Sequence, residues 1–404
     1  MSEVVDRFLR YVAIDTQSQD DAPCFPSTEK QKDLAALLVR ELKEIGAAEP
    51  RMDDYGYVYA SIPSNIEGKA PVLAFIAHMD TSPAVSGKDV KARIEKFNGE
   101  SMTLSEGNVL SVSDYPEIAK YKGMDLIVTD GTTLLGADDK AGLAEIMTMV
   151  SRLVSDPSIR HGEIRIAFTP DEEVGCGVDH IDMKEVGADY AYTVDGGELG
   201  EIEYENFNAA SFKLVVNGKN IHPGSAKGKM KNSILMGMEF HNMLPVFDNP
   251  AFTEGYEGFY HLDEISGNVE RASLTYIIRD HDMDKFKAKK AMAEKICAFL
   301  NDKYGEGSFV YSLKDSYYNM REKIEENFHL VENAKKAMLD CGVEPKIIPI
   351  RGGTDGARLS FMGLPCPNLS TGGHNFHGRF EYIPVASLEK MVDVLLRLVD
   401  IYSR

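Results

Sequence analysis

The sequence predicts an α/β protein of two domains, with the smaller domain inserted into the larger one. At 404 residues the chain exceeds what one hydrophobic core usually holds. Short apolar runs alternate with amphipathic helical segments in the first and last parts, as in helices packed on a sheet. Between these parts the expected order becomes strand–helix–strand–strand–helix–strand, the ferredoxin-like arrangement. We therefore expect one domain at 1–206 plus 317–404 and an inserted domain at 207–316.

The first part contains the elements of a buried sheet. Residues 3–13 have the spacing of an amphipathic helix. A second helix should follow Thr28 and Gln31, which can form a capping box, and should stop at Gly46. The continuous apolar run "PVLAFIA" at 71–77 suits a strand buried on both faces. Further elements are expected as a helix at 141–154 and strands at 164–169 and 190–194.

The middle part begins and ends with strands. Strands are expected at 210–216, 258–265, 269–279 and 308–315, and helices at 233–244 and 283–303. The Gly-Asn pair in "ISGNVE" is typical of a hairpin turn between the two central strands. After 320 the α/β pattern returns, with a helix at 328–341, strands at 346–350 and 367–371, and a last helix at 385–402.

Composition excludes several classes of protein. The net charge of −20 argues against a nucleic-acid partner, because a phosphate backbone needs a basic face. The five cysteines are scattered without a CxxC pair, which fits a reducing cytoplasm. The beginning of the chain has no long apolar core typical of a signal peptide, and no apolar run approaches the length of a membrane span.

Polar residues follow the expected strands of the larger domain. Loops beyond strand C-termini form the site in α/β sheets. Imidazoles and carboxylates of this kind bind divalent transition metals, and zinc is common in hydrolases. More candidate ligands are present than one ion needs, which indicates two metals about 3.5–4 Å apart. The candidates are His78, Asp80, Asp138, Asp139, Asp171, Glu172, Glu173, Asp195, His374 and His377.

Spacing suggests roles for some of these residues. His78 and Asp80 are two apart and face the same way on an extended chain, so Asp80 can orient the His78 ring. Of Glu172 and Glu173, one should point at the metals, and the other can stand beside the water as general base.

A set of long motifs resembles the M20 metallopeptidases. In chain order they are "AHMDTSP", "LLGADDKAG", "FTPDEEVG", "YTVDGGELGE", "NIHPGSAKG" and "RGGTDGARLSFMGLPCPNLSTGG", which span nearly the whole chain. The resemblance implies a zinc-peptidase-like three-layer catalytic domain, an inserted lid or dimerisation domain, a homodimer, and two Zn²⁺ per subunit.

The resemblance also assigns site residues by position. It implies the metal ligands His78, Asp138, Glu173, Asp195 and His377. Asp138 would bridge both ions, with His78 and Asp195 on one ion and Glu173 and His377 on the other. Glu172 would be the general base, Asp80 would orient a ligand, and the peptide bond between Asp138 and Asp139 is expected to be cis. His222 would reach into the neighbouring subunit's site and stabilise the oxyanion.

Some residues keep two interpretations. Asp139 could be an N-cap with favourable charge at a helix start. Of the two histidines in the last motif, the resemblance places the ligand at the one followed by Gly378, which is His377 and not His374. Arg279 and Arg351 could bind the substrate's carboxylate through a bidentate guanidinium, or could form structural ion pairs.

The function that the resemblance implies is that of a cytoplasmic, metal-dependent aminopeptidase. It would release the N-terminal residue of short peptides, with tripeptides as the expected substrate, by attack of a water held by two zinc ions. The alternatives are a related dipeptidase or N-acyl amino acid amidohydrolase, and, in a different class, a non-catalytic peptide- or metal-binding protein.

Overall fold

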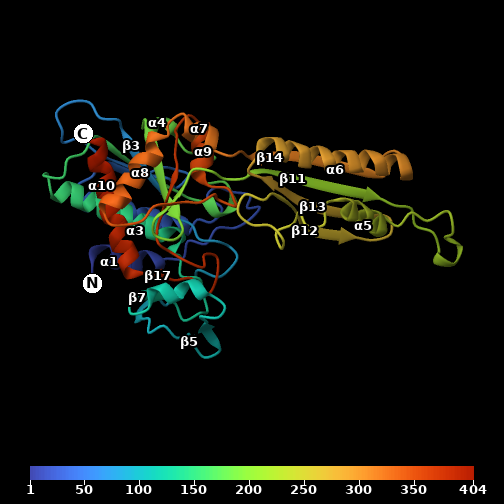
Figure 1. Ribbon diagram of the computed structural model, residues 1–404, viewed down its shortest axis with the longest axis horizontal. Helices are drawn as coiled ribbons and strands as arrows, with labels where there is room; N and C mark the ends of the chain where they lie inside the picture. Colours follow the sequence, from blue (N-terminus) through green and yellow to red (C-terminus); the bar gives the residue numbers. More distant parts are fainter. The chain divides into compact units, whose positions relative to one another are not determined.

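The computed structural model describes residues Met1–Arg404, which form two compact units (Figure 1). Unit 1 comprises Met1–Tyr204, Glu322–Ile348 and Thr354–Arg404, and unit 2 comprises Glu205–Arg321 and Pro349–Gly353. The chain passes between the units at 204/205 and 321/322, compared with the expected 206/207 and 316/317. Pro349–Gly353 was expected in the catalytic domain but lies in unit 2, where Arg351 donates hydrogen bonds to the backbone of Thr253 and Glu257.

Unit 1 is built on an eight-stranded sheet. Its strand order is β1-β2-β8-β3-β9-β16-β10-β15. The central strands β8, β3, β9 and β16 run parallel, so their C-terminal ends meet at one edge. The strands are β1 (Ala48–Met52), β2 (Val58–Ile62), β3 (Leu73–His78), β8 (Ile164–Thr169), β9 (Tyr190–Gly196), β10 (Glu201–Glu203), β15 (Lys346–Ile347) and β16 (Asn368–Ser370).

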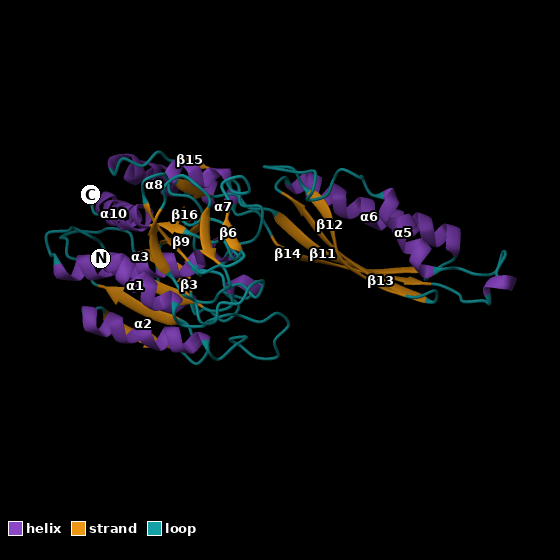
Figure 2. Ribbon diagram, turned by 90° about the horizontal axis from the view of Figure 1, so that it is seen from below, coloured by secondary structure: helices purple, strands orange, loops and turns teal.

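Helices cover this sheet (Figure 2). α3 packs against β3 and β9 and contacts α1 and α10 on its other sides. Gly142 of α3 lies so close to the sheet that an added Cβ would be 1.9 Å from the Val194 carbonyl oxygen. The helices of unit 1 are α1 (Glu3–Val12), α2 (Gln31–Ile45), α3 (Ala137–Ser155), α4 (Met183–Val186), α7 (Arg321–Glu325), α8 (His329–Asp340), α9 (Asp355–Phe361) and α10 (Val385–Tyr402), of which α7 starts one residue inside unit 2. No helix of the chain combines the length and apolar character needed to cross a bilayer.

A smaller subdomain within unit 1 was not expected from the sequence. It contains a three-stranded sheet of order β17-β7-β4 and the hairpin β5-β6. Its own apolar cluster includes Phe97, Ile118 and Tyr382. These strands are only two to four residues long, too short for a hydrophobic period to show. They are β4 (Arg93–Lys96), β5 (Met102–Ser105), β6 (Asn108–Leu110), β7 (Asp125–Val128) and β17 (Ile383–Pro384), with the 3₁₀ helix η1 (Pro116–Tyr121).

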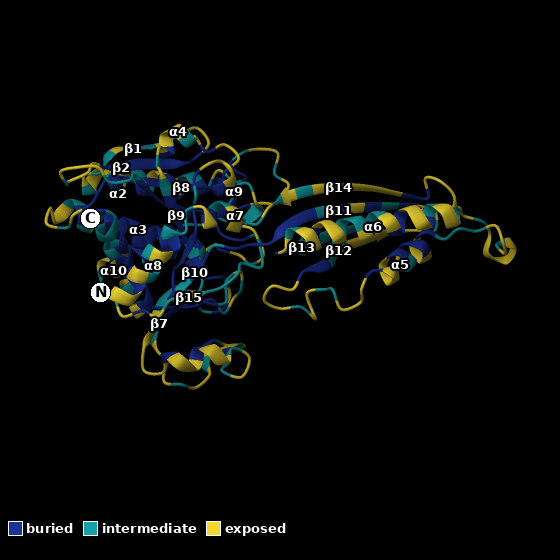
Figure 3. Ribbon diagram, turned by 45° about the horizontal axis from the view of Figure 1, so that its top comes forward, coloured by how far each residue is buried: buried dark blue, intermediate teal, exposed yellow.

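Unit 2 has the ferredoxin-like order. Its elements are β11 (Asn208–Asn217), η3 (Pro223–Ser225), α5 (Ser233–Met243), β12 (Phe259–Gly267), β13 (Arg271–Asp280), α6 (Met283–Tyr304) and β14 (Phe309–Tyr317). The strands form one antiparallel sheet of order β12-β13-β11-β14. Alternate residues of β13 are buried, and the buried set packs into a core with α5 and α6 (Figure 3). The expected six-element order is confirmed.

The expected capping box at the start of α2 is wrong. The residue before the helix is Lys30, and no side chain caps it. The Gln31 amide instead donates to Asp171, 2.6 Å away. Gly46 does end α2 in the left-handed conformation, as expected. The strand expected at 346–350 is restricted to Lys346–Ile347.

Candidate metal centre

Five side chains assigned as ligands come together in unit 1 from separate parts of the chain. His78 is the last residue of β3, and Asp195 lies near the end of β9. Glu173 lies in the 3₁₀ turn η2 (Glu172–Val174), directly after β8. Asp138 precedes the regular part of α3, and His377 lies in the loop between β16 and β17. Parallel strand ends therefore supply three of the five groups.

The Asp138 carboxylate lies between two histidines. Its Oδ1 is 2.8 Å from His78 Nε2, and its Oδ2 is 3.0 Å from His377 Nε2. His78 Nε2 is also 3.3 Å from Asp195 Oδ1, and His377 Nε2 is 2.8 Å from Glu173 Oε2. The five groups thus form two sets that share Asp138.

Glu172 belongs to the same cluster. Ligand atoms of His78, Glu172 and Asp195 lie within 4.8 Å of one another, as do those of His78, Asp138 and Glu173. The Glu172 carboxylate is therefore close enough to touch a cation held there, or a water beside it.

Burial of so many acids raises their proton affinity. Burial, followed by repulsion from Asp138, raises the pKa of Glu173 to about 7. Burial likewise raises the pKa of Asp195 to about 6, and raises the pKa of Glu172 well above its usual value, with repulsion from Asp195 and Asp355 adding to it. These carboxylates resist being charged together without a cation nearby.

The histidines respond in the opposite sense. Hydrogen bonds to Asp138 and Glu173 raise the pKa of His377 to about 11. Burial alone would lower the pKa of His78, but Asp195, Asp138 and Asp80 raise it well above its usual value. Each imidazole therefore holds a proton that a divalent cation would replace.

The donor set fits two divalent cations. It offers nitrogen and carboxylate oxygen with no thiolate, the ligand chemistry of zinc in hydrolases. Oε1 of Glu173 is buried without a hydrogen-bond partner, and therefore has a free lone pair to coordinate a cation.

Asp80 contacts and orients other residues of the cluster. His78 Nδ1 is 3.0 Å from the Asp80 carbonyl oxygen and 3.3 Å from its Oδ1. The Asp80 carboxylate also accepts the backbone N–H groups of Glu172 and Glu173 at 3.0 and 3.2 Å. One buried acid thus orients a histidine and fixes the turn that carries two neighbouring acids.

The three acids of "DEE" point in two different directions. Asp171, at φ +59°, turns away from the cluster and accepts hydrogen bonds from Ser27 and Gln31. Glu172 and Glu173 turn toward it. Spacing along the chain did not by itself set Asp171 apart from Glu172 and Glu173, because its direction depends on a left-handed backbone conformation.

The two histidines of the last motif also point in different directions. His374 faces away from the centre, within 2.6 Å of the Tyr121 hydroxyl, and burial lowers its pKa to about 4. His377 faces Asp138 and Glu173. His377 lies beside the other candidate ligands, and its role as a metal ligand stays a prediction.

The Asp139 carboxylate accepts hydrogen bonds from the backbone of two elements. It accepts the backbone N–H groups of His78 at 3.1 Å and Gly142 at 3.2 Å. The second contact is the helix-start interaction that sequence reasoning considered, and the first ties the start of α3 to the end of β3. The peptide bond between Asp138 and Asp139 is cis, as expected.

Two buried acids near the cluster were missed. Glu381 accepts the backbone N–H groups of Leu135, Gly136 and Asp138 at 2.6, 2.7 and 3.1 Å. Asp355 accepts a hydrogen bond from Thr169 at 2.9 Å, and burial raises its pKa to about 7. The "TDG" and "FEY" motifs that carry them show no metal-ligand spacing, so only the fold reveals these positions.

The remaining predicted residues lie in unit 2. His222 is exposed before η3, and its Nδ1 accepts the N–H of Gly224. Arg279 donates to the Arg351 carbonyl, and Arg351 donates to the carbonyls of Thr253, Gly255 and Glu257. Both arginines are therefore engaged with unit 2 itself, and their role in substrate binding stays a prediction.

The fold and the centre together define a metal-dependent hydrolase of the M20 class. A family model described as "Peptidase dimerisation domain" matches residues 204–307. An M20 peptidase from Bacillus subtilis described as dinuclear metal binding has the same fold, with a TM-score of 0.66 at 14% identity over 98% of this chain and 97% of that one. The aminopeptidase PepT from Bacillus cereus superposes with a TM-score of 0.79 at 24% identity, over 100% and 98% of the two chains.

Sequence relatives narrow the class further. The chain is 56% identical to peptidase T of Caldanaerobacter subterraneus over 407 residues, and 56% identical to that of Halothermothrix orenii over 406, with 100% of both chains covered. It is 54% identical to peptidase T of Clostridium novyi over its full length. The chain belongs to the peptidase T family and is a metal-dependent aminopeptidase.

Proposed function

We propose that this aminopeptidase removes the N-terminal residue from tripeptides, with two zinc ions held by His78, Asp138, Glu173, Asp195 and His377. The observation that carries the proposal is the Asp138 carboxylate, whose oxygens lie 2.8 and 3.0 Å from two histidines. Its relatives named peptidase T support the substrate class.

When bound, the ions would polarise the scissile carbonyl and increase the acidity of water. Glu172 takes a proton from the attacking water as its oxygen bonds to the carbonyl carbon, and delivers that proton to the amine as the C–N bond breaks. Asp80 holds the backbone of Glu172 and thereby aims its carboxylate. His222, from the partner subunit, donates a hydrogen bond to the oxyanion.

The test is a comparison of substrates and variants. Leu-Gly-Gly should be cleaved faster than Leu-Gly, Leu-Gly-Gly-Gly or N-acetyl-leucine. Glu172→Gln should keep two metals per chain by mass spectrometry and lose about 10²–10⁴-fold in kcat. Glu163→Gln, at the opposite end of β8, is the matched control and should be unchanged.

Faster hydrolysis of N-acetyl-leucine would favour the amidohydrolase, and preference for Leu-Gly the dipeptidase. Full activity of the Glu172→Gln variant would remove the proposed base. A chain that binds metal and peptide without turnover would be the non-catalytic protein.

The enzyme acts as a homodimer through unit 2. Three observations support this: the match to a dimerisation domain, the apolar composition of α5, and its exposed outer side. Met236 and Phe240 of α5 are buried, yet Leu235 and Met238 on the other side remain 62% and 50% exposed. Large apolar side chains exposed on one side of a helix are typical of a surface that a partner covers.

Sedimentation of the double variant Leu235→Lys/Met238→Lys tests the dimer. A monomer with reduced kcat would support both the interface and the role of His222 across it. A dimer of unchanged mass would contradict the interface, and a fully active monomer would contradict the role of His222.

The cytoplasm is the proposed location, since all five cysteines are free. Cell fractionation tests this, and activity in an extracellular fraction would contradict it.

A further inference from the structure

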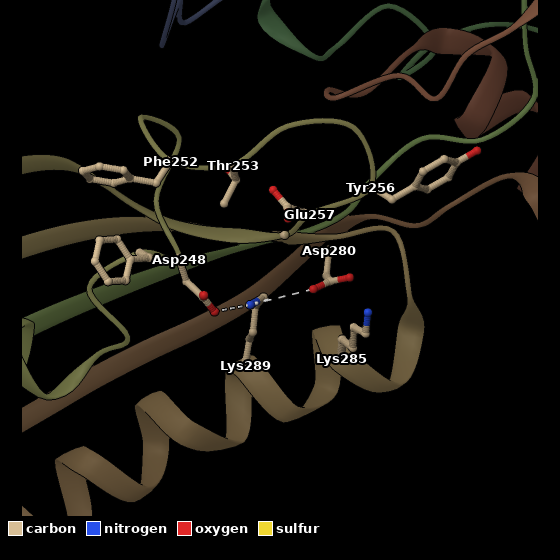
Figure 4. A pocket seen from close by; sticks show the side chains of 10 residues that line it. Asp248, Phe252, Thr253, Tyr256, Glu257, Asp280, Lys285 and Lys289 are labelled. Atoms are coloured by element: carbon tan, nitrogen blue, oxygen red, sulfur yellow. Dashed lines mark hydrogen bonds and ion pairs between the residues drawn. The ribbon is translucent and has the colours of Figure 1, made fainter.

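Unit 2 contains a cavity of about 380 Å³ that the proposed function does not use (Figure 4). Its lining comes from the loop after α5, from the end of β13 and from the first turns of α6. The volume lies within the range of small-molecule sites.

A buried carboxylate lies in the wall of this cavity. Asp280 is 2% exposed, and its Oδ1 accepts the backbone N–H of Asp282. The nearest cation to its Oδ2 is Lys289 Nζ, at 3.8 Å, which is beyond hydrogen-bond range. A Cβ added to Gly258 would lie 2.2 Å from this oxygen, so glycine is needed there. The oxygen is an acceptor that a ligand's N–H could satisfy.

Two lysines of α6 line the cavity, but only one is paired. Lys289 Nζ is 2.6 Å from Asp248 Oδ2. Lys285 lies one turn earlier on the same side of the helix, is exposed, and forms no ion pair (Figure 4). Its ammonium can accept an anion without breaking an existing contact.

The other wall is apolar. Phe247 and Phe252 are 68% and 62% exposed, and their rings meet edge to face with centroids 5.3 Å apart. Such exposed aromatic pairs offer apolar surface to a ligand side chain.

We propose that this cavity binds a free α-amino acid with an apolar side chain. Its ammonium would donate to Asp280 Oδ2, its carboxylate would pair with Lys285, and its side chain would lie on Phe247 and Phe252. A zwitterion fits because a carboxylate oxygen, 3.8 Å from the Lys289 ammonium, and the unpaired ammonium of Lys285 line the same small space.

The cavity lies on the opposite face of the sheet from Arg279, one of the two arginines predicted to bind substrate. Asp280 and Arg279 are neighbours on β13, so their side chains point to opposite faces of the sheet. Asp280 is on the face that α5 and α6 cover, together with Tyr276 and Ile278.

The loop that lines the cavity is held in place. Arg351 donates to the carbonyls of Thr253, Gly255 and Glu257, and the Tyr256 hydroxyl donates to Glu205 at 3.2 Å. The cavity is thereby formed before any ligand arrives, which lowers the cost of binding.

Calorimetric titration of the metal-loaded enzyme tests the proposal with three probes. L-Leucine carries both charged groups, isoamylamine lacks the carboxylate, and 4-methylpentanoic acid lacks the ammonium. Wild type should bind leucine at least tenfold more tightly than either analogue. None of the three probes contains a peptide bond, so turnover does not interfere.

Lys285→Ala and its matched control Lys287→Ala, another exposed lysine of α6, locate the site. Lys285→Ala should weaken leucine at least tenfold and leave isoamylamine within twofold, so that the two probes bind alike. Lys287→Ala should change neither. Thermal unfolding of both variants checks their folding, and Lys285→Gln replaces Lys285→Ala if that variant unfolds early.

Binding of leucine at the metal centre alone would give the same leucine-to-isoamylamine ratio in wild type and Lys285→Ala, and that result would overturn the proposal. Absence of saturable leucine binding in wild type would overturn it as well.

Discussion

One acidic cluster in each unit shows a different way of balancing negative charge. In unit 1, Glu172, Glu173 and Asp195 gather around two histidines, with no lysine or arginine paired to them. In unit 2, Asp248 and Asp280 face Lys289, at 2.6 and 3.8 Å. The only cations that the chain supplies to the first cluster are two imidazoles, whereas the second cluster has a lysine.

The difference concerns how the negative charge of each cluster is balanced. A buried acid costs free energy unless a cation or a set of N–H donors meets it. In the unit 2 cluster Lys289 pairs closely with Asp248 and reduces the cost of burying Asp280. In the unit 1 cluster no lysine or arginine meets the acids, and under the proposed function a metal ion from solution would supply the missing charge.

The largest effect is expected from Asp138→Asn. The change removes the charge that both metal sets share, so both ions should be lost, with activity falling about 10³-fold or more. Metal analysis by mass spectrometry beside a tripeptide assay measures it, with Asp156→Asn, at the exposed residue directly after α3, as control. Two retained metals would break the comparison between the units.

Glu203→Gln should change how stability depends on pH. Burial raises the pKa of Glu203 to about 8, so the folded state holds its proton more tightly than the unfolded chain. Its stabilising contribution is complete below pH 4.5 and is lost as the pH rises through 8, by up to about 1.4 kcal/mol per pH unit. The glutamine variant should lack this slope in urea unfolding, whereas exposed Glu344→Gln should keep it.

Equal slopes in wild type and Glu203→Gln would mean that Glu203 is solvated. That outcome would contradict the raised proton affinity of Glu203 in the folded protein.

The Glu381→Gln variant tests a buried acid whose carboxylate accepts hydrogen bonds from backbone N–H groups. Replacing one oxygen by an NH₂ group turns a donor toward the backbone donors of Leu135, Gly136 or Asp138. The loop before Asp138 should shift, and zinc affinity should fall about tenfold to hundredfold. Competition with a chelator measures this, and unaltered affinity would assign Glu381 to stability alone. Exposed Glu389→Gln is the control.

The smallest effect is expected in unit 2. Lys289→Met leaves Asp248 and Asp280 without their cation and should cost about 1–3 kcal/mol of unfolding free energy. Lys287→Met, on the exposed side of the same helix, should cost little. If both variants were equally stable, the match of charges in unit 2 would have no energetic meaning.

Local sequence patterns predicted much of the fold. The six buried residues of β3 predicted a central strand, and the order of elements around β11 to β14 predicted the ferredoxin-like unit. The patterns failed where elements are short, as in β4 to β7, or where a tertiary contact replaced a local one. Gln31 was expected to cap its own helix but instead serves Asp171, 140 residues away.

The sequence by itself determined which residue types stand after each buried strand, and this set predicted a metal centre. Those residues are visible because a strand's apolar run ends abruptly before them. Only the tertiary structure decided which side chains meet. Asp171 and Glu172 are chemically alike neighbours, yet backbone torsion sends one to Ser27 and the other to Asp195. A one-dimensional pattern records spacing along the chain, whereas such directions depend on contacts between distant segments.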